Sequence, residues 1–276
     1  MLLRTIAAVS AVLTAVLFMC CDLAVWLIPV MLAGFFLGLL LAAFLILCAF
    51  TAAVDMDKPR EEDSRLYRAV MNLYIEALIP LVGLKIETAG LEKTPGEGRF
   101  LLVCNHQNDS DPGILMHFFR NSQLAFISKR ENRSLFVVGK FMHMTLCQLV
   151  NRENDREALK TILKCIQILR EDKASIAAFP EGGILVKDKL SHFRSGMFKI
   201  AQKANVPIVV CTLKGTSDLF DNMRKLKRTH VRLHLLDVIP AEEVKISNTV
   251  ELGERIYQMM LNDLGPEYQL ENKETP

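Results

Sequence analysis

Apolar and charged residues are unevenly distributed along this chain of 276 residues. Within residues 5–54 the only charged side chain is that of Asp22, whereas further along the chain apolar runs alternate with polar loops. About 50 apolar residues are roughly twice what one bilayer crossing needs. We therefore predict a membrane-anchoring helical hairpin over residues 1–54, with helices near 5–21 and 24–53. A single long tilted helix is the alternative.

A cleaved signal peptide explains this segment less well than a hairpin, because it would be shorter and would end at a small-residue cleavage site. The apolar run instead continues through Trp26 and Pro29 to Phe50. Basic residues flank both of its ends; they are Arg4, Lys58, Arg60, Arg65 and Arg68. By the positive-inside rule we expect the rest of the chain to face the cytoplasm, at the cell membrane if the chain is bacterial.

Residues 55–83 should connect the hairpin to the remainder of the chain. Residues 55–64 form a charged linker, and a stretch of helical periodicity follows, with Arg65 and Arg68 on its polar side. Pro80 is expected to end this helix. The helix would lie either at the membrane interface or against a protein core.

Downstream of residue 84, short apolar runs alternate with stretches of helical periodicity. The runs predict strands over 84–87, 99–104, 123–128, 146–150, 174–178, 206–213 and 230–238. The periodic stretches predict helices over 112–119, 155–170, 197–204 and 250–264, while residues 135–144 are helical or looped. This alternation is typical of the α/β class, so we expect one domain over 84–276 with a central mixed, largely parallel sheet flanked by helices.

Charge and cysteine content narrow the function only slightly. The formal net charge of +2 argues neither for nor against a nucleic-acid partner, and we expect none. Seven cysteines without zinc spacing indicate reduced thiols. His117, His143 and His192 lack partners at metal-ligand spacing, so we expect no metal and no cofactor.

The polar stretch from Cys104 to Pro112 follows a predicted buried strand and precedes a predicted helix. It contains His106 and, five residues on, Asp111, which are the minimum needed for a general base and the carboxylate that orients it. A loop histidine with Asp111 as a helix N-cap is an equally good explanation from this stretch alone. Cys104 as a thiol nucleophile is a weaker third possibility, because thiols that end buried strands are usually inert.

A second polar loop, Phe179-Pro180-Glu181-Gly182-Gly183, also follows a predicted buried strand. In parallel sheets ligands bind beyond the carboxyl ends of the strands, so both loops can open into the same crevice. Glu181 would accept hydrogen bonds from ligand hydroxyls, and Gly182 would let a ligand approach the backbone. Taken alone, this loop is more typical of a surface turn with one acidic residue.

Together the two loops resemble the glycerolipid acyltransferase family, whose best-known members are the lysophosphatidic acid (1-acylglycerol-3-phosphate) acyltransferases. The resemblance covers residues 84–238 and rests on four motifs that occur in the family's order. The motifs are Asn105-His106 with Asp111, Leu149-Val150-Asn151-Arg152, Phe179-Pro180-Glu181-Gly182 with Phe193-Arg194-Ser195-Gly196, and Val206-Pro207-Ile208-Val209. The chain departs from the family where Gly183 replaces a threonine or serine, and at Met144-Thr145-Leu146-Cys147 before the arginine block.

The resemblance implies an enzyme that moves a fatty acyl group from acyl-CoA or acyl carrier protein to the hydroxyl of a lysolipid in the membrane. His106 would be the general base and Asp111 its orienting carboxylate. The expected substrate-binding residues are Asn105, at the oxyanion, with Glu181, Gly182, Arg152 and Arg194, the arginines binding phosphate. Lys129 and Arg130 are weaker phosphate candidates.

Three functions remain open at this point. The favoured one is synthesis of phosphatidic acid from lysophosphatidic acid, as in phospholipid biosynthesis. The second is acylation of another lysolipid or an amino-acid-derived lipid, which Gly183 keeps open because a hydroxyl that would contact the acceptor is missing. The third is a non-catalytic lipid-binding protein. A basic run at Arg224, Lys225, Lys227, Arg228 and Arg232 would face anionic lipid headgroups or an acidic carrier protein, or else only solvent.

Overall fold

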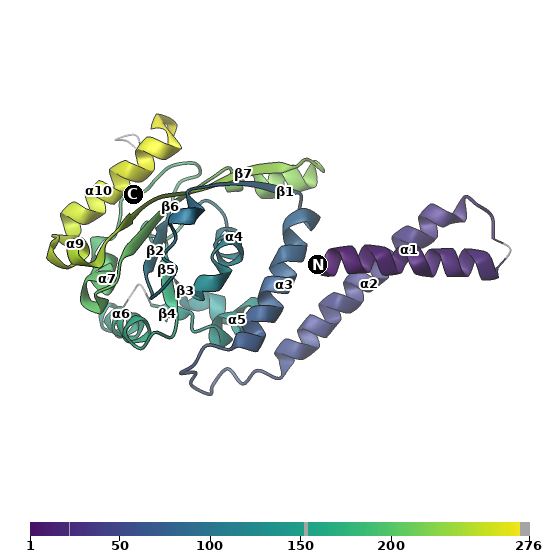
Figure 1. Cartoon of the computed structure of the whole chain (residues 1–276), viewed down its shortest axis with the longest axis horizontal. Helices are drawn as coiled ribbons and strands as arrows, with labels where there is room; N and C mark the ends of the chain where they lie inside the picture. The colour runs from purple at the N-terminus through teal and green to yellow at the C-terminus, as the bar shows by residue number, and fades with distance from the viewer. Residues whose placement is uncertain (22, 152–153, 271–276) are drawn as a thin grey trace.

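The computed structural model describes residues 1–21, 23–151 and 154–270, which form an α/β body and a helical hairpin that projects from it (Figure 1). The helices are α1 (Leu2–Cys20), α2 (Leu27–Ala52), α3 (Arg65–Leu81), α4 (Asp111–Phe118), α5 (Val138–Met144), α6 (Asp155–Arg170), α7 (Phe198–Ala204), α8 (Leu219–Arg224), α9 (Ala241–Ile246) and α10 (Thr249–Leu264). The strands are β1 (Leu84–Ala89), β2 (Leu101–Cys104), β3 (Leu124–Lys129), β4 (Gln148–Val150), β5 (Ser175–Ala178), β6 (Ile208–Lys214) and β7 (Thr229–Ile239). Short 3-10 turns lie between them, among them η3 (Arg130–Ser134) and η6 (Pro266–Tyr268).

The seven strands form one sheet in the order β1-β7-β6-β2-β5-β3-β4. All neighbouring strands are parallel except β6 and β7, which pair antiparallel from Ile208 opposite Ile239 to Lys214 opposite Arg232. The predicted mixed, largely parallel sheet is therefore confirmed. The carboxyl ends of β2, β3, β4, β5 and β6 share one edge of the sheet, where β1 and β7 begin. We call this the carboxyl edge and its opposite the amino edge.

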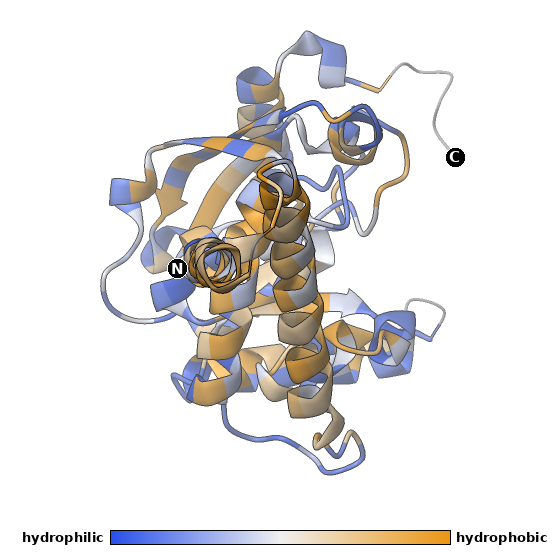
Figure 2. Cartoon of the chain, turned by 90° about the vertical axis from the view of Figure 1, so that its right-hand side faces the viewer, coloured by the Kyte–Doolittle hydropathy of each residue, from blue (hydrophilic) through white to orange (hydrophobic). Residues whose placement is uncertain are grey.

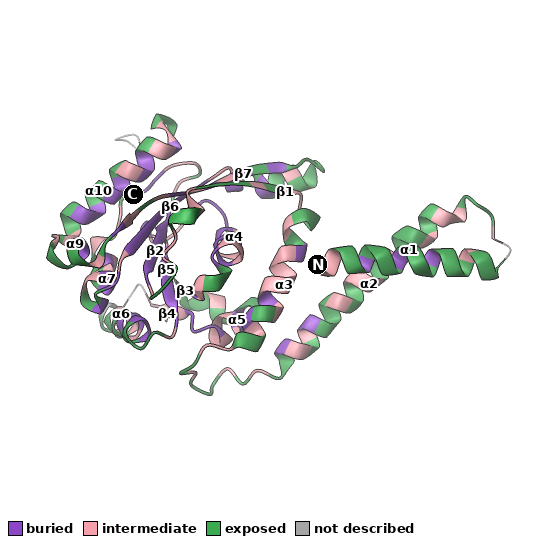
Figure 3. Cartoon of the chain, in the orientation of Figure 1, coloured by how far each residue is buried: buried purple, intermediate pink, exposed green. Residues whose placement is uncertain are grey.

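Helices cover the two faces of the sheet and bury its apolar side chains. On one face, α6, α7 and α10 close over side chains such as Val103, Ile176 and Val210. On the other face, α3 and α4 close over Leu102, Ala177 and Val209. The alternation between the two cores follows the period-two geometry of a strand, and Figure 3 shows the central strands buried throughout.

Polar side chains define several helix starts. Asn154 accepts hydrogen bonds from the backbone amides of Arg156 and Glu157 at the start of α6, and Asn248 accepts one from Val250 at the start of α10. These caps satisfy amides that have no partner within the helix. Of the two helices, α6 spans the predicted residues and α10 starts one residue before its predicted range.

The two N-terminal helices contact each other, as predicted for a hairpin, and both are long and apolar enough to cross a bilayer. The buried side of α1 is the stripe Ile6, Ser10 and Thr14, whose spacing of four residues places them on one helix face. The small Ser10 and Thr14 let the helices approach closely, and their hydroxyls donate to carbonyls one turn back. Figure 2, viewed from the side of the hairpin, shows its helices as largely apolar, and Figure 3 shows most of its surface exposed.

The hairpin rests on α3. The Tyr74 hydroxyl donates to the Ala43 carbonyl at 2.7 Å, the Tyr67 hydroxyl donates to that of Phe50 at 3.4 Å, and the Phe50 and Tyr67 rings are 4.5 Å apart. Because α3 also packs on the sheet, it joins the hairpin to the α/β body.

Two predictions about α3 were wrong. Arg68 is buried, not on the polar side of the helix, because its guanidinium forms an ion pair with Asp63 at 2.6 Å and donates to the Leu124 and Thr145 carbonyls. Pro80 does not end the helix, which continues to Leu81. Pro80 has no amide hydrogen to donate to the Glu76 carbonyl, so it removes one helical hydrogen bond, and the helix ends one residue after it.

Candidate active site

The two polar loops identified in the sequence lie side by side at the carboxyl edge. The loop with His106 follows β2 and the loop with Glu181 follows β5, and these two strands are parallel neighbours. The convergence follows from the topology, since adjacent parallel strands deliver their following loops to the same edge.

His106 and Asp111 form a hydrogen-bonded pair. The ring Nδ1 lies 2.9 Å from Asp111 Oδ2, and the Asp111 side chain is fully buried whereas 14% of the His106 side chain is exposed. A carboxylate at Nδ1 favours the tautomer that carries its proton there and leaves Nε2 as the acceptor. In the part of the chain that the structure describes, no residue bonds to Nε2, so this nitrogen is available to take a proton from a bound hydroxyl.

Asp111 does not act as the N-cap of its helix. Ser110 occupies that position and Asp111 is the first helical residue, so the helix begins one residue earlier than predicted. Its Oδ2 accepts hydrogen bonds from the backbone amides of Gln107 at 2.7 Å and Asn108 at 2.8 Å, in addition to the imidazole. The carboxylate therefore fixes the course of the loop as well as the orientation of the His106 ring.

Phe179 supports the same imidazole from its other side, a role that we had not foreseen. Its ring stacks on the His106 ring with 4.0 Å between centroids and 9° between planes. The residue opens the Phe179-Pro180-Glu181-Gly182 block, so its place in the motif was a signal that it lies near the histidine. Stacking and the bond to Asp111 together restrict rotation of the ring.

Glu181 joins the two loops. Oε1 accepts from the backbone amide of His106 at 2.7 Å and Oε2 accepts from that of Ser191 at 2.8 Å. The side chain is buried, and desolvation raises the pKa of Glu181 to about 7, against the two amide bonds that lower it. Because both oxygens already have protein partners, its predicted contact with substrate hydroxyls stays a prediction.

Both polar atoms of the Asn105 side chain also have hydrogen-bond partners within the protein. Its side-chain Nδ2 donates to the Leu213 carbonyl and its Oδ1 accepts from the Leu213 amide, both at 2.8 Å. Gln107 makes a similar link, accepting from the Gly215 amide at 3.1 Å. The two amides attach the histidine loop to the end of β6, and the predicted oxyanion contact of Asn105 stays a prediction.

The structure brings Arg194 to the glutamate loop. Its backbone amide donates to the Pro180 carbonyl at 2.9 Å, and its side chain lies over Gly182. A Cβ at Gly182 would fall 2.7 Å from Arg194 Nε, and the φ of +80° is one that glycine adopts readily. The absence of a side chain at Gly182 therefore leaves space for Arg194. This arginine is exposed, and a guanidinium suits a phosphate.

The remaining phosphate candidates are less informative. Arg152 lies outside the described residues. Lys129 is exposed at the end of β3, and Arg130 follows it with its guanidinium 3.5 Å from Glu157. Both lie at the carboxyl edge, two strands away from the histidine loop.

Cys104 is unsuited to nucleophilic attack. Its thiol is buried, and desolvation raises the pKa of Cys104 well above its usual value, so the reactive thiolate is disfavoured. Among the described residues no group of three His, Cys, Asp or Glu side chains is arranged to hold a metal.

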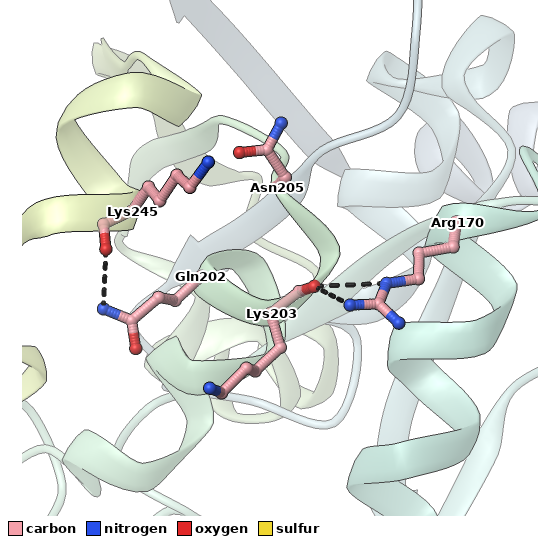
Figure 4. Close-up of a pocket in the computed structure, with 5 residues that line it drawn as sticks. All are labelled: Arg170, Gln202, Lys203, Asn205 and Lys245. Atoms are coloured by element: carbon pink, nitrogen blue, oxygen red, sulfur yellow. Dashed lines mark hydrogen bonds between the residues drawn. The ribbon is translucent and has the colours of Figure 1, made fainter.

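A polar hollow at the amino edge is lined by Arg170, Gln202, Lys203, Asn205 and Lys245 (Figure 4). The Arg170 guanidinium donates twice to the Lys203 carbonyl, and Gln202 Nε2 donates to carbonyls that include that of Lys245. These side chains close the ends of α7 and α9, where carbonyls lack helical partners. The hollow is thus remote from His106 and is explained by helix termination.

Known proteins match both the sequence and the fold. Residues 85–214 match the family described as Acyltransferase. A probable 1-acyl-sn-glycerol-3-phosphate acyltransferase of Mycoplasma pneumoniae is 30% identical over 63% of this chain and 64% of its own length, so the chain spans just under two thirds of that relative. The 1-acyl-sn-glycerol-3-phosphate acyltransferase of Escherichia coli is 26% identical over 72% of this chain and 78% of its own.

The fold also has a solved counterpart. The crystal structure of the 1-acyl-sn-glycerophosphate (LPA) acyltransferase PlsC from Thermotoga maritima superposes with a TM-score of 0.61, covering 79% of this chain and 86% of that one at 19% identity. The family match includes β2, β5, the His106–Asp111 pair and the glutamate loop. The residues of the candidate site therefore lie in the part of the chain that matches the acyltransferase family.

Proposed function

We propose that this protein transfers a fatty acyl group from acyl-CoA or acyl carrier protein to the free hydroxyl of lysophosphatidic acid, which yields phosphatidic acid. The observation that carries the proposal is the His106–Asp111 pair, with Nδ1 held at 2.9 Å by a buried carboxylate and Nε2 open. The names of the relatives, which are 1-acyl-sn-glycerol-3-phosphate acyltransferases, support this acceptor.

A thioester is already activated, so the enzyme needs only to deprotonate an alcohol and hold it against the carbonyl carbon. As the hydroxyl oxygen attacks, its proton passes to His106 Nε2 and a tetrahedral intermediate forms. When the intermediate collapses, the carbon–sulfur bond breaks and the thiolate takes the proton from the imidazolium. Positioned base catalysis of this kind contributes about 10²–10⁴-fold, and alignment of the two substrates adds to it.

Arg194 is the residue we assign to the acceptor phosphate, because its guanidinium lies on the glutamate loop beside Gly182. Arg152 is the second phosphate candidate, from the sequence motif alone. Glu181 and Asn105 hold the loops together in this proposal and bring their neighbouring backbone to the substrate.

The hairpin is proposed to anchor the enzyme in the membrane, where both the lysolipid and its product reside. Basic residues Arg4, Lys58, Arg60 and Arg65 near the two ends favour a cytoplasmic location for the α/β body. A lysolipid would then reach His106 without being extracted into water.

A different lysolipid is the second candidate acceptor, and Gly183 is the observation that favours it. The residue provides no hydroxyl where relatives in the family usually have one, so a contact to the acceptor is missing.

Acceptor choice is tested with the purified full-length protein in detergent, a labelled acyl donor, and lysophosphatidic acid beside lysolipids that carry other headgroups. Acyl-CoA and acyl carrier protein are supplied in separate reactions. We expect the highest kcat/KM with lysophosphatidic acid, and a gain in that preference in Gly183→Thr. Faster transfer to a headgroup without a terminal phosphate would replace the proposed acceptor, and no transfer to any lysolipid would refute the function.

A further inference from the structure

We propose that two exposed apolar segments, one on each side of the catalytic loops, insert into the interfacial layer of an anionic phospholipid bilayer. The first, the α8 tip, comprises Phe220, Met223 and Leu226 with the cations Arg224, Lys225, Lys227 and Arg228. The second, the α5 shoulder, comprises Leu135, Phe136 and Val138. The proposal rests on the membrane location given above, and it adds protein–lipid contacts outside the hairpin.

The α8 tip combines apolar side chains with unpaired positive charge. Leu226 is 96% exposed at the turn between α8 and β7, and Phe220 is 53% exposed. The four cations are exposed, and within the described part of the chain their side chains form no hydrogen bond or ion pair. Interfacial binding has two components: apolar side chains insert among the acyl chains, and neighbouring cations bind the lipid phosphate groups.

The α5 shoulder exposes its apolar residues together. Leu135 is 47% and Phe136 61% exposed in the loop between η3 and α5, and Val138, the first residue of α5, is 53% exposed. Lys140 Nζ lies 4.5 Å from the centre of the Phe136 ring. Single exposed apolar residues are ordinary, whereas a contiguous group on a soluble surface marks an interaction site.

Both segments lie at the carboxyl edge, where His106 lies. The α8 tip follows β6 and the α5 shoulder follows β3, and in the sheet these strands flank β2 and β5, whose loops hold His106 and Glu181. A surface that touches both segments would therefore meet the catalytic loops between them.

Helix α3, on which the hairpin packs, contacts α5 at one end and the residue after the α8 tip at the other. At one end of α3, the Ser64 amide donates to the carbonyl of Met144, which is the last residue of α5 and lies at the opposite end of that helix from the α5 shoulder. At the other end, the Thr229 amide after the α8 tip donates to the Gly83 carbonyl, both bonds being 3.0 Å long. The hairpin packs on α3 between them, and Figure 1 shows it leaving the body on the side of α3 that faces away from the sheet. The positive charge of the α8 tip favours contact with an anionic bilayer over contact with a neutral one.

The test uses single-tryptophan variants of the full chain, because Trp26 in the hairpin is the only natural tryptophan. Leu226→Trp and Phe136→Trp are each combined with Trp26→Phe. The matched control is Ile246→Trp in the same background, since Ile246 is 85% exposed on α9 at the amino edge. Each protein is reconstituted into phosphatidylcholine–phosphatidylglycerol vesicles with and without bromine near the headgroup end of the acyl chains.

We expect blue-shifted emission and quenching by bromine for Leu226→Trp and Phe136→Trp, and neither effect for Ile246→Trp. Replacing the four α8 cations by glutamine, or phosphatidylglycerol by phosphatidylcholine, should reduce quenching at position 226 and leave that of wild-type Trp26 unchanged. If Trp26 is quenched while positions 226 and 136 behave like position 246, the proposal is overturned although the hairpin is inserted. The readout needs no substrate, so it is independent of the acyl-transfer assay.

Discussion

At the scale of single residues, the imidazole of His106 is held by one buried carboxylate and one aromatic ring. Asp111 accepts three hydrogen bonds through a single oxygen, from two backbone amides and the histidine. Phe179 covers the ring face. This arrangement leaves Nε2 without a hydrogen-bond partner among the described residues and predicts different effects for different replacements.

Asp111→Asn keeps the size of the side chain but can place an amide NH₂ against Nδ1. The imidazole would then favour the opposite tautomer and lose its free acceptor at Nε2. We expect kcat to fall by about 10²–10⁴-fold with a much smaller change in KM. Steady-state kinetics with lysophosphatidic acid measure this, and Phe179→Leu, which removes only the stacking, is expected to cost less. Near-normal kcat in Asp111→Asn would show that the carboxylate only shapes the loop.

Glu181 predicts a pH-dependent stability. Its folded-state pKa of about 7 lies above that of an ordinary carboxyl, so the folded state binds more protons than the unfolded state between those values. Stability attributable to Glu181 is then greatest at low pH and falls as pH rises toward 7, by an amount on the order of 3 kcal/mol across the window.

The comparison of wild type with Glu181→Gln isolates this contribution. Denaturant unfolding in detergent at several pH values should show a free-energy difference between the two proteins that changes in the stated direction. A difference independent of pH would mean that Glu181 has the same pKa in both states.

At the scale of elements, the attachment of α3 to the α/β body depends on a buried ion pair. The side chains of Arg68 and Asp63 are 8% and 6% exposed and lie 2.6 Å apart. Arg68→Met leaves Asp63 buried without its partner and is expected to destabilise the protein by about 3–5 kcal/mol. Arg68→Met with Asp63→Leu should recover much of that loss, and Arg65→Met, at an exposed position of the same helix, should be nearly neutral. Thermal unfolding in detergent provides the measurement. If Arg68→Met leaves the stability unchanged, the ion pair does not hold α3 on the α/β body.

The glutamate loop gives a second prediction at this scale. In Gly182→Ala the new methyl group would meet Arg194 and the backbone would be strained at φ +80°. If Arg194 binds the acceptor phosphate, this variant and Arg194→Gln should both raise KM for lysophosphatidic acid. Gly196→Ala is the matched control, because a Cβ there meets nothing within 4 Å and φ is not positive. An unchanged KM in Gly182→Ala and Arg194→Gln would remove Arg194 from the phosphate site.

Sequence periodicity identified most elements but not those governed by tertiary contacts. The helix over Asp155–Arg170 and the buried strands were predictable because each has a strong local pattern and α6 has a side-chain cap. The burial of Arg68 was not predictable, since the Leu124 and Thr145 carbonyls that its guanidinium contacts come from other segments. The short helices α8 and α9 were missed because six residues carry too little periodicity.

At the scale of the whole molecule, sequence order alone did not reveal which strands are neighbours. The convergence of the histidine and glutamate loops could be predicted, because both follow buried strands of a largely parallel sheet, and the structure places β2 beside β5. The attachment of Asn105 to Leu213 could not, because it depends on β6 pairing with β2, more than 100 residues away in the sequence. The same pairing sets the α8 tip and the α5 shoulder on opposite sides of His106.

We propose that His106 is the base that activates the lipid hydroxyl in a membrane-anchored acyltransferase. The most direct test is the rate of labelled acyl transfer to lysophosphatidic acid by purified His106→Ala, with circular dichroism and thermal unfolding used to verify that the variant is folded. We predict that kcat falls by about 10²–10⁴-fold with the fold intact. A folded His106→Ala protein that transfers acyl groups at close to the wild-type rate would contradict the account.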